Sequence, residues 1–283
     1  MSQSTKTMLG KCFKYVLLIV FSVVFMLPLV WLVSNSFKTF SQIIAFPPSL
    51  IPKPFLTSNY TALFNKADPN YVPIPTFILN SFLVCIGCVT GTLFSTVLTG
   101  YAFARLHCRL KGFLFVLLLA TLMIPSSVLV IPIFKLFRDI HFLNSLKALI
   151  VPSFFGNAFF IFFMRQFLMG IPYELDEAAY IDGASPFGIL FKILLPLCKP
   201  VLMSVVVLTF VETWTDFYNP LIFLTSENKM TLAVGLAMFQ GQRMSLLGLL
   251  SAATVISIIP MVILFFSAQK YFVEGISFSG LKA

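Results

Sequence analysis

The chain is built from long apolar stretches that are separated by shorter polar segments. Six stretches are long enough to cross a membrane, because about 20 apolar residues span roughly 30 Å of hydrocarbon. Their expected ranges are 14–34, 77–104, 113–134, 146–169, 200–224 and 247–269. Apolarity is continuous and does not alternate with polar positions, which favours helices over a β-barrel. The pattern predicts an all-α polytopic membrane protein, with six transmembrane helices in a single domain, residues 1–283.

Composition supports a protein that lies in the lipid bilayer. Apolar residues make up 59% of the 283 positions, and Asp, Glu, Lys and Arg together only 10%, whereas ordinary soluble domains carry roughly 25% charged residues. So few charges cannot cover a water-soluble surface, and the hydrophobicity excludes a disordered chain. The net charge of +9 is scattered over short loops without a basic run, so we interpret it as charge beside membrane segments and expect no nucleic-acid partner.

The placement of Lys and Arg predicts that both termini lie in the cytoplasm. Lys6, Lys11 and Lys14 precede the first apolar stretch, and the short loop 105–112 is also basic. Positive residues accumulate in cytoplasmic loops, and this orientation places eleven of the 19 Lys and Arg inside and eight outside. The first stretch is longer than the apolar core of a cleaved signal peptide, so we expect it to be retained as a span.

An outer loop is expected between the first two spans. Residues 36–76 contain seven prolines, and proline breaks helices: Pro47, Pro48, Pro52, Pro54, Pro69, Pro73 and Pro75. We therefore expect an irregular loop here and no seventh span.

Small residues recur on one face of the second span. Gly87 and Gly91 form a G-x-x-x-G pattern that Ser95 and Thr99 continue. Such residues let another helix backbone approach closely. Packing within the chain and packing against a partner subunit would both use this face.

No residue set indicates an enzyme or a metal site. Cys85 and Cys88 have C-x-x-C spacing, which can bind metal or act in redox chemistry, but their stretch holds no His or acidic ligand. His107 and His141 have no partner at metal-ligand spacing. We expect buried thiols, no metal, and no catalytic residues.

The cytoplasmic segment from about 170 to 199 differs from the short loops elsewhere. Its first half has the residues of a short helix that ends at a glycine: Pro172, Glu174, Asp176, Glu177, Ala178, Ala179 and Gly183. Ser185 and Pro186 then suit the N-cap and first position of a second helix. With Asp182, the first half holds four of the ten acidic residues. Interfacial helices favour Lys and Arg, so a docking site for a cytoplasmic protein explains the acids better than a membrane surface does.

The same segment carries the spacing of a known motif. Glu177-Ala178-Ala179, Gly183, Ile193 and Leu195-Pro196 resemble the E-A-A signature of ABC importer permeases. Other parts of the chain resemble the sugar-import permeases typified by the second membrane subunit of the maltose importer. These parts are Ser36-Phe37-Lys38, Pro47-Pro48 with Pro52, Asn59-Tyr60, Trp214-Thr215-Asp216-Phe217 with Pro220-Leu221, and the tail 271–276 with Gly280 and Lys282, where Ala283 replaces the usual final Gly.

The resemblance implies a type I ABC importer permease fold and a set of partners. These are a second homologous permease, two cytoplasmic ATPase subunits and an extracytoplasmic solute-binding protein that delivers a sugar, in a bacterial cytoplasmic membrane. It further implies that the segment around Glu177 is the coupling helix that docks on one ATPase, with Glu177 paired to a basic residue and Gly183 at the turn. The chain has no G-x-x-x-x-G-K-[ST] loop, so we expect ATP and Mg on the ATPase subunits and no cofactor on this chain.

Two acidic residues fall within the fifth predicted span. Glu212 and Asp216 are four positions apart, on one helix face, about 18 and 24 Å along the helix from Pro200. Ionisable residues inside a membrane are functional candidates, and carboxylates beside Trp214 suit a sugar, which has hydroxyl groups and apolar ring faces. Glu212, Trp214 and Asp216, with Tyr218 and Asn219 as weaker companions, are the candidate substrate-path residues. A role at the outer interface or as helix caps stays open for both acids.

Three alternatives to a sugar importer remain. An ABC permease for a non-sugar solute would share the E-A-A segment. An ion-coupled secondary transporter could use Glu212 and Asp216, although it would not need an ATPase docking segment. An intramembrane enzyme would need nucleophiles, bases or metal ligands that the spans do not contain.

Overall fold

The computed structural model describes residues 3–67, 71–242 and 246–280, and within these ranges it contains helices and no strands. The chain forms two compact units. The first comprises residues 1–74 and 236–258, and the second comprises residues 75–235 and 259–283. Two helices, α14 (Leu232–Gln242) and α15 (Leu247–Gly280), contribute to both units.

The first unit begins with the apolar helix α1 (Gln3–Ser36). The proline-rich loop that follows contains two short helices, α2 (Phe40–Ile43) and α3 (Ser58–Phe64). Thr39 starts α2 with a capping box, because its side chain accepts from the backbone N–H of Gln42 while the Gln42 side chain accepts from the Thr39 N–H. The loop is therefore only partly irregular.

Two sequence motifs of this unit are in direct contact. Asn59 donates from Nδ2 to the carbonyl oxygens of Ser36 and Lys38, at 2.9 and 3.0 Å. Ser36 Oγ lies 2.8 Å from the Tyr60 hydroxyl. The Lys38 side chain is 1% exposed and donates to Asn35 Oδ1 and Ser49 O. The Ser-Phe-Lys and Asn-Tyr motifs thus form one polar network that joins the two ends of this part of the loop.

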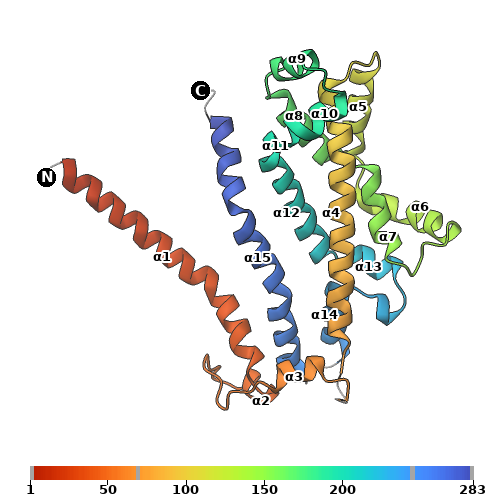
Figure 1. The fold of residues 1–283 in the computed structure, drawn as a ribbon. Coiled ribbons are helices and arrows are strands. Elements are labelled where there is room, and N and C mark those ends of the chain that lie inside the picture. The colour runs from red at the N-terminus through yellow and green to blue at the C-terminus, as the bar shows by residue number, and fades with distance from the viewer. Residues whose placement is uncertain (1–2, 68–70, 243–245, 281–283) are drawn as a thin grey trace. The chain divides into compact units, whose positions relative to one another are not determined.

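The second unit carries the rest of the helical core. Its helices are α4 (Ile74–Arg105), α5 (Lys111–Thr121), α6 (Ser126–Asp139), α7 (Lys147–Ile150), α8 (Ala158–Met169), α9 (Glu174–Ile181), α10 (Pro186–Gly188), α11 (Leu195–Leu197), α12 (Lys199–Thr215) and α13 (Tyr218–Phe223). Helix α8 packs against α5 and α12, and α13 packs against α7. Helices α9 and α10 lie at the end of α4 where that helix stops (Figure 1).

Each predicted span overlaps a helix or a pair of helices. Four described helical segments are long and apolar enough to span a membrane: Lys11–Ser36, Ile74–Arg105, Lys147–Met169 and Leu247–Lys270. Two bent pairs raise the number to six if each pair forms one span. They are Lys111–Thr121 with Ser126–Asp139, bent by 97°, and Pro186–Leu197 with Lys199–Thr215, bent by 79°.

The stretches 113–134 and 200–224 are each divided between two helices and do not form one continuous helix. Pro125 disfavours helical geometry in the residue before it, so α5 ends at Thr121 and α6 begins at Ser126. Helix α12 ends at Thr215, because Asp216 has extended geometry with ψ of 113°. The chain then turns into the separate helix α13.

The small residues of α4 pack within the chain. A Cβ atom at Gly91 would overlap the Ser153 side chain and lie 2.6 Å from the Phe154 ring. Ser95 Oγ also lies 3.1 Å from the Ser153 carbonyl oxygen, as donor. The face of α4 that carries Gly87, Gly91 and Ser95 therefore packs against residues 150–154 of the same chain. Of the two kinds of packing that the sequence allows, the structure shows packing within the chain.

Candidate functional site

The acidic segment at the end of α4 folds as the sequence predicts, with one correction. Helix α9 covers Glu174–Ile181, and Gly183 follows with φ of 81°, a left-handed conformation that favours glycine. Ser185 caps the next helix by accepting from the Gly188 N–H at 3.2 Å. Pro172 was expected in the first helical turn, but it precedes the helix because α9 begins at Glu174.

The acidic residues of this segment face in different directions. Glu174, Glu177 and Asp182 are exposed, as are Ala178 and Gly183. Asp176 and Ala179 are buried, at 2% and 5% exposure. Of the seven predicted docking residues, five therefore remain accessible and two face the interior of their own chain.

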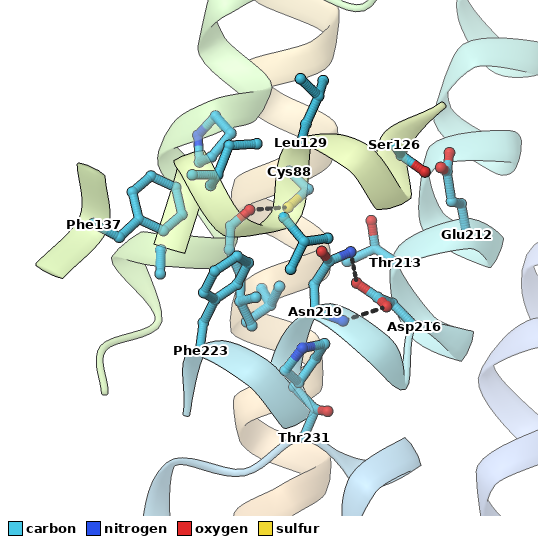
Figure 2. Close-up of a pocket in the computed structure, with 17 residues that line it drawn as sticks. Cys88, Ser126, Leu129, Phe137, Glu212, Thr213, Asp216, Asn219, Phe223 and Thr231 are labelled. Carbon is cyan, nitrogen blue, oxygen red and sulfur yellow. Dashed lines mark hydrogen bonds between the residues drawn. The ribbon is translucent and has the colours of Figure 1, made fainter. Parts of the chain in front are cut away.

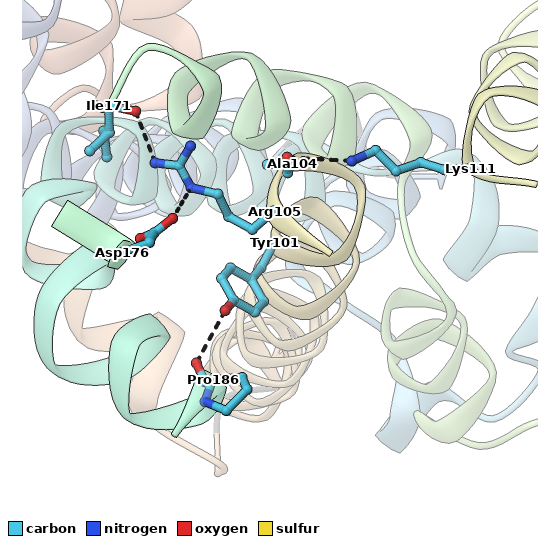
Figure 3. A network of polar contacts seen from close by, with 7 residues as sticks. All are labelled: Tyr101, Ala104, Arg105, Lys111, Ile171, Asp176 and Pro186. Carbon is cyan, nitrogen blue, oxygen red and sulfur yellow. Dashed lines mark hydrogen bonds and ion pairs between the residues drawn. The ribbon is translucent and has the colours of Figure 1, made fainter. Parts of the chain in front are cut away.

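Asp176 is paired with the last residue of α4 (Figure 3). Arg105 Nε lies 2.7 Å from Asp176 Oδ2, and both side chains are less than 10% exposed. Arg105 also donates from Nη2 to the carbonyl oxygen of Ile171, at 2.9 Å. Burial raises the pKa of the Asp176 carboxyl, and the Arg105 guanidinium opposes that shift. Sequence reasoning missed Arg105 as a site residue, because nothing local connects positions 105 and 176.

The same segment packs against α8 through apolar side chains. Ile189, Leu190 and Leu194 are fully buried against Met164 and Leu168 of α8, in one cluster that also includes Ala179. Residues Ile189–Leu194 form a π-helical turn, a feature that is frequent at functional sites. One side of the segment therefore packs on an apolar cluster, while Glu174, Glu177 and Asp182 remain exposed.

A cavity of about 370 Å³ lies elsewhere in the second unit (Figure 2). Its walls come from α4, α6, α7, α12 and α13, and they are mostly apolar: Val84, Cys88, Leu129, Val130, Ile133, Phe137, Ala148, Leu149, Pro152, Pro220 and Phe223. The polar lining residues are Ser126, Glu212, Thr213, Asp216, Asn219 and Thr231. Ligand pockets of about 300–1,000 Å³ with a few convergent polar groups are typical of small-molecule sites.

The structure brings together three of the five substrate-path candidates. Glu212, Asp216 and Asn219 line the cavity. Asp216 accepts from the backbone N–H of Asn219 at 3.1 Å and from its side chain at 2.9 Å, which starts the turn into α13. Among the described residues, no hydrogen bond or ion pair reaches the Glu212 carboxylate.

The other two candidates lie outside the cavity lining. Trp214 is 4% exposed and packs against Phe82 and Phe210, with ring centroids 4.8 and 5.5 Å away. Tyr218 is 53% exposed. Their positions follow from the helix, since Trp214 occupies the face of α12 that is opposite to Glu212 and Asp216.

The cysteines are unpaired, and Cys85 and Cys88 are buried in α4. The Cys88 thiol donates to the Leu149 carbonyl oxygen at 3.4 Å. Within ranges 3–67, 71–242 and 246–280, no group of three or more His, Cys, Asp or Glu could hold a metal ion. The tail motif has no described side chains, and its Lys282 and Ala283 lie outside the described residues.

Residues 91–278 match the family described as binding-protein-dependent transport system inner membrane component. The match covers α4 from Gly91 onward, the acidic segment and the polar end of α12. It therefore includes most of the features described above.

Curated proteins and a solved structure are similar over nearly the whole chain. The probable ABC transporter permease protein YurM of Bacillus subtilis is 33% identical over 98% of this chain and 90% of its own length. The arabinooligosaccharides transport system permease protein AraQ of the same organism is 32% identical, with 92% of each chain covered. A crystal structure of a bacterial ABC transporter that imports the acidic polysaccharide alginate aligns with a TM-score of 0.81 and 25% identity, covering 96% of this chain and 99% of that one.

Proposed function

The chain belongs to the family of inner membrane components of binding-protein-dependent transport systems, and from this premise we propose that it is the permease subunit of a sugar or oligosaccharide importer. Its relatives are transport permeases and not enzymes. Family membership also removes the grounds for the ion-coupled transporter and the intramembrane enzyme. The proposed substrate class follows the substrates for which two similar proteins are named, arabinooligosaccharides and alginate.

The exposed side of α9 supports the proposal that an ATPase docks on this helix. Ile181, Tyr180 and Leu175 are 87%, 48% and 41% exposed beside Glu174 and Glu177. Helix α9 exposes large apolar and acidic side chains on one face and buries its other face within the chain. Such an exposed face is typical of a protein-binding surface. Two cytoplasmic ATPase subunits would bind ATP and Mg and supply the energy for transport. Glu177 would pair with a basic residue of one ATPase subunit.

The remaining partners complete a pore. A second, homologous permease would share the translocation path, and a solute-binding protein would deliver sugar from outside. The cavity that contains Glu212, Asp216 and Asn219 would form part of that path, because carboxylates and an amide accept hydrogen bonds from sugar hydroxyls. We place the chain in the bacterial cytoplasmic membrane with both termini in the cytoplasm, since positive loop residues favour that side.

Purification of the intact complex through a tag on this chain tests the function. We expect an ATPase, a second permease and a binding protein to copurify, and vesicles containing the complex to take up labelled oligosaccharide only with ATP inside. ATP-driven uptake of a non-sugar solute alone would overturn the substrate class. Solute uptake by this polypeptide without any ATPase would overturn the importer itself.

A further inference from the structure

The last turn of α4 contacts the acidic segment at three separate places. Arg105 binds the Asp176 carboxylate within α9 and the Ile171 carbonyl oxygen ahead of it. Tyr101, one turn earlier, donates from its hydroxyl to the Pro186 carbonyl oxygen at 3.2 Å, beyond the Gly183 turn. We name these contacts the α4 joint (Figure 3). The joint holds both sides of α9 as well as the helix itself.

The Arg105–Asp176 ion pair of the joint requires both of its residues. Both partners are buried, and in the described part of the chain no other hydrogen-bond donor reaches either carboxylate oxygen of Asp176. Removing one partner of a buried ion pair leaves an uncompensated charge, which costs far more than the pair itself contributes. Asp176 is therefore committed to Arg105 and is unavailable to an external protein.

Helix α4 connects this joint to the cavity. Val84 and Cys88 of α4 line the cavity, and Arg105 ends the same helix. Residues 88 and 105 are about 26 Å apart along the axis at 1.5 Å per residue. Helix α4 is continuous from Ile74 to Arg105, whereas two other predicted spans are sharply bent. A continuous helix transmits displacement of one end to the other.

We propose that the α4 joint couples the docking helix to the cavity wall, so that α9 and α4 move together when an ATPase displaces α9. Tyr101, Arg105 and Asp176 act as positioning residues in this device. The proposal rests on the proposed docking function of α9. It assigns Asp176 to intrachain transmission, although its neighbours Glu174 and Glu177 face the partner.

A double-mutant cycle on the intact complex in vesicles tests the joint. The variants are Arg105→Gln, Asp176→Asn and the combination, and the readout is the ratio of solute imported to ATP hydrolysed. We expect each single change to lower the ratio about tenfold, and the combination to lower it about tenfold as well, because residues that act through one another are not additive. Asp139→Asn is the matched control, since it removes the partner of the exposed Arg138–Asp139 ion pair, and it should leave the ratio unchanged.

Tyr101→Phe is a milder variant that removes one hydroxyl and keeps the packing. We expect it to assemble normally and to lower the ratio about threefold, in line with the loss of one hydrogen bond. An unchanged ratio in Tyr101→Phe would overturn the proposal. So would a roughly hundredfold loss in the double variant, which indicates independent roles, or a loss of thermal stability with an unchanged ratio. If no ATPase copurifies with the wild-type chain, the docking function fails as well, and that result is distinct from an altered ratio in a functioning complex.

Discussion

A Cβ atom added to Gly87 would lie 2.7 Å from Cγ2 of Ile150 and 3.0 Å from two further atoms of the same side chain. Helix α4 and the last residue of α7 are therefore in backbone-to-side-chain contact at this point. Gly91 makes the same kind of contact with Phe154 one turn later. The contact holds together two walls of the cavity, since Cys88 and Leu149 both line it.

Gly87→Leu should destabilise the protein, because the new side chain needs the space that Ile150 occupies. Overpacking of this kind costs about 1–3 kcal/mol. Thermal unfolding of the purified chain in detergent should show a lower midpoint than the wild type. Gly112→Ala is the control, since nothing lies within 4 Å of its added Cβ, and an equal loss in that variant would contradict the packing explanation.

Gly183→Val should impair coupling through backbone strain and not through a clash. The residue has φ of 81° and no atom within 4 Å of an added Cβ, and left-handed geometry costs an ordinary residue about 1–2 kcal/mol. We expect a lower ratio of transport to ATP hydrolysis in reconstituted vesicles. Gly183→Asn should be milder, because asparagine tolerates this region, and equal defects in both variants would point to side-chain size instead.

Glu177→Lys should weaken ATPase docking, because it reverses an exposed charge that is proposed to meet a basic partner. Loss of an interfacial charge pair costs about 2–5 kcal/mol, so affinity should fall at least about tenfold. Copurification of the ATPase at increasing salt measures this. Glu227→Lys reverses an exposed acid outside the docking segment, and it should leave the ATPase bound.

Glu212→Gln should reduce uptake while assembly and ATPase binding are preserved. A hydrogen bond to a charged group contributes about 1.5–3 kcal/mol, which corresponds to at least about tenfold in uptake at low substrate concentration. Initial rates of labelled oligosaccharide uptake measure the effect. Wild-type rates in this variant would remove Glu212 from the substrate path.

The acidic segment was predictable because its signals are local. The glycine at 183 and the cap at Ser185 act on residues within one turn, and both have the expected geometry. The orientation of Asp176 was not predictable in this way. It depends on Arg105, which only the tertiary fold brings to within 2.7 Å.

The cavity was predictable in part. Four-residue spacing placed Glu212 and Asp216 on one face, and both line the cavity. The same apolarity that indicated spans concealed the breaks at Pro125 and Asp216, because hydrophobicity measures burial in lipid and not helix continuity. Trp214 lies outside the cavity lining and packs against Phe82 and Phe210, so its place in the substrate path stays a prediction.

Two of the three anchoring contacts at the end of α4 use main-chain oxygen atoms, those of Ile171 and Pro186. Every residue type supplies that atom, so substitutions on the outward side of the segment leave these anchors intact. Under the proposed docking function, changes confined to the exposed surface of α9 would therefore be enough to suit a different ATPase. The contacts between α9 and the helix that lines the cavity would be retained.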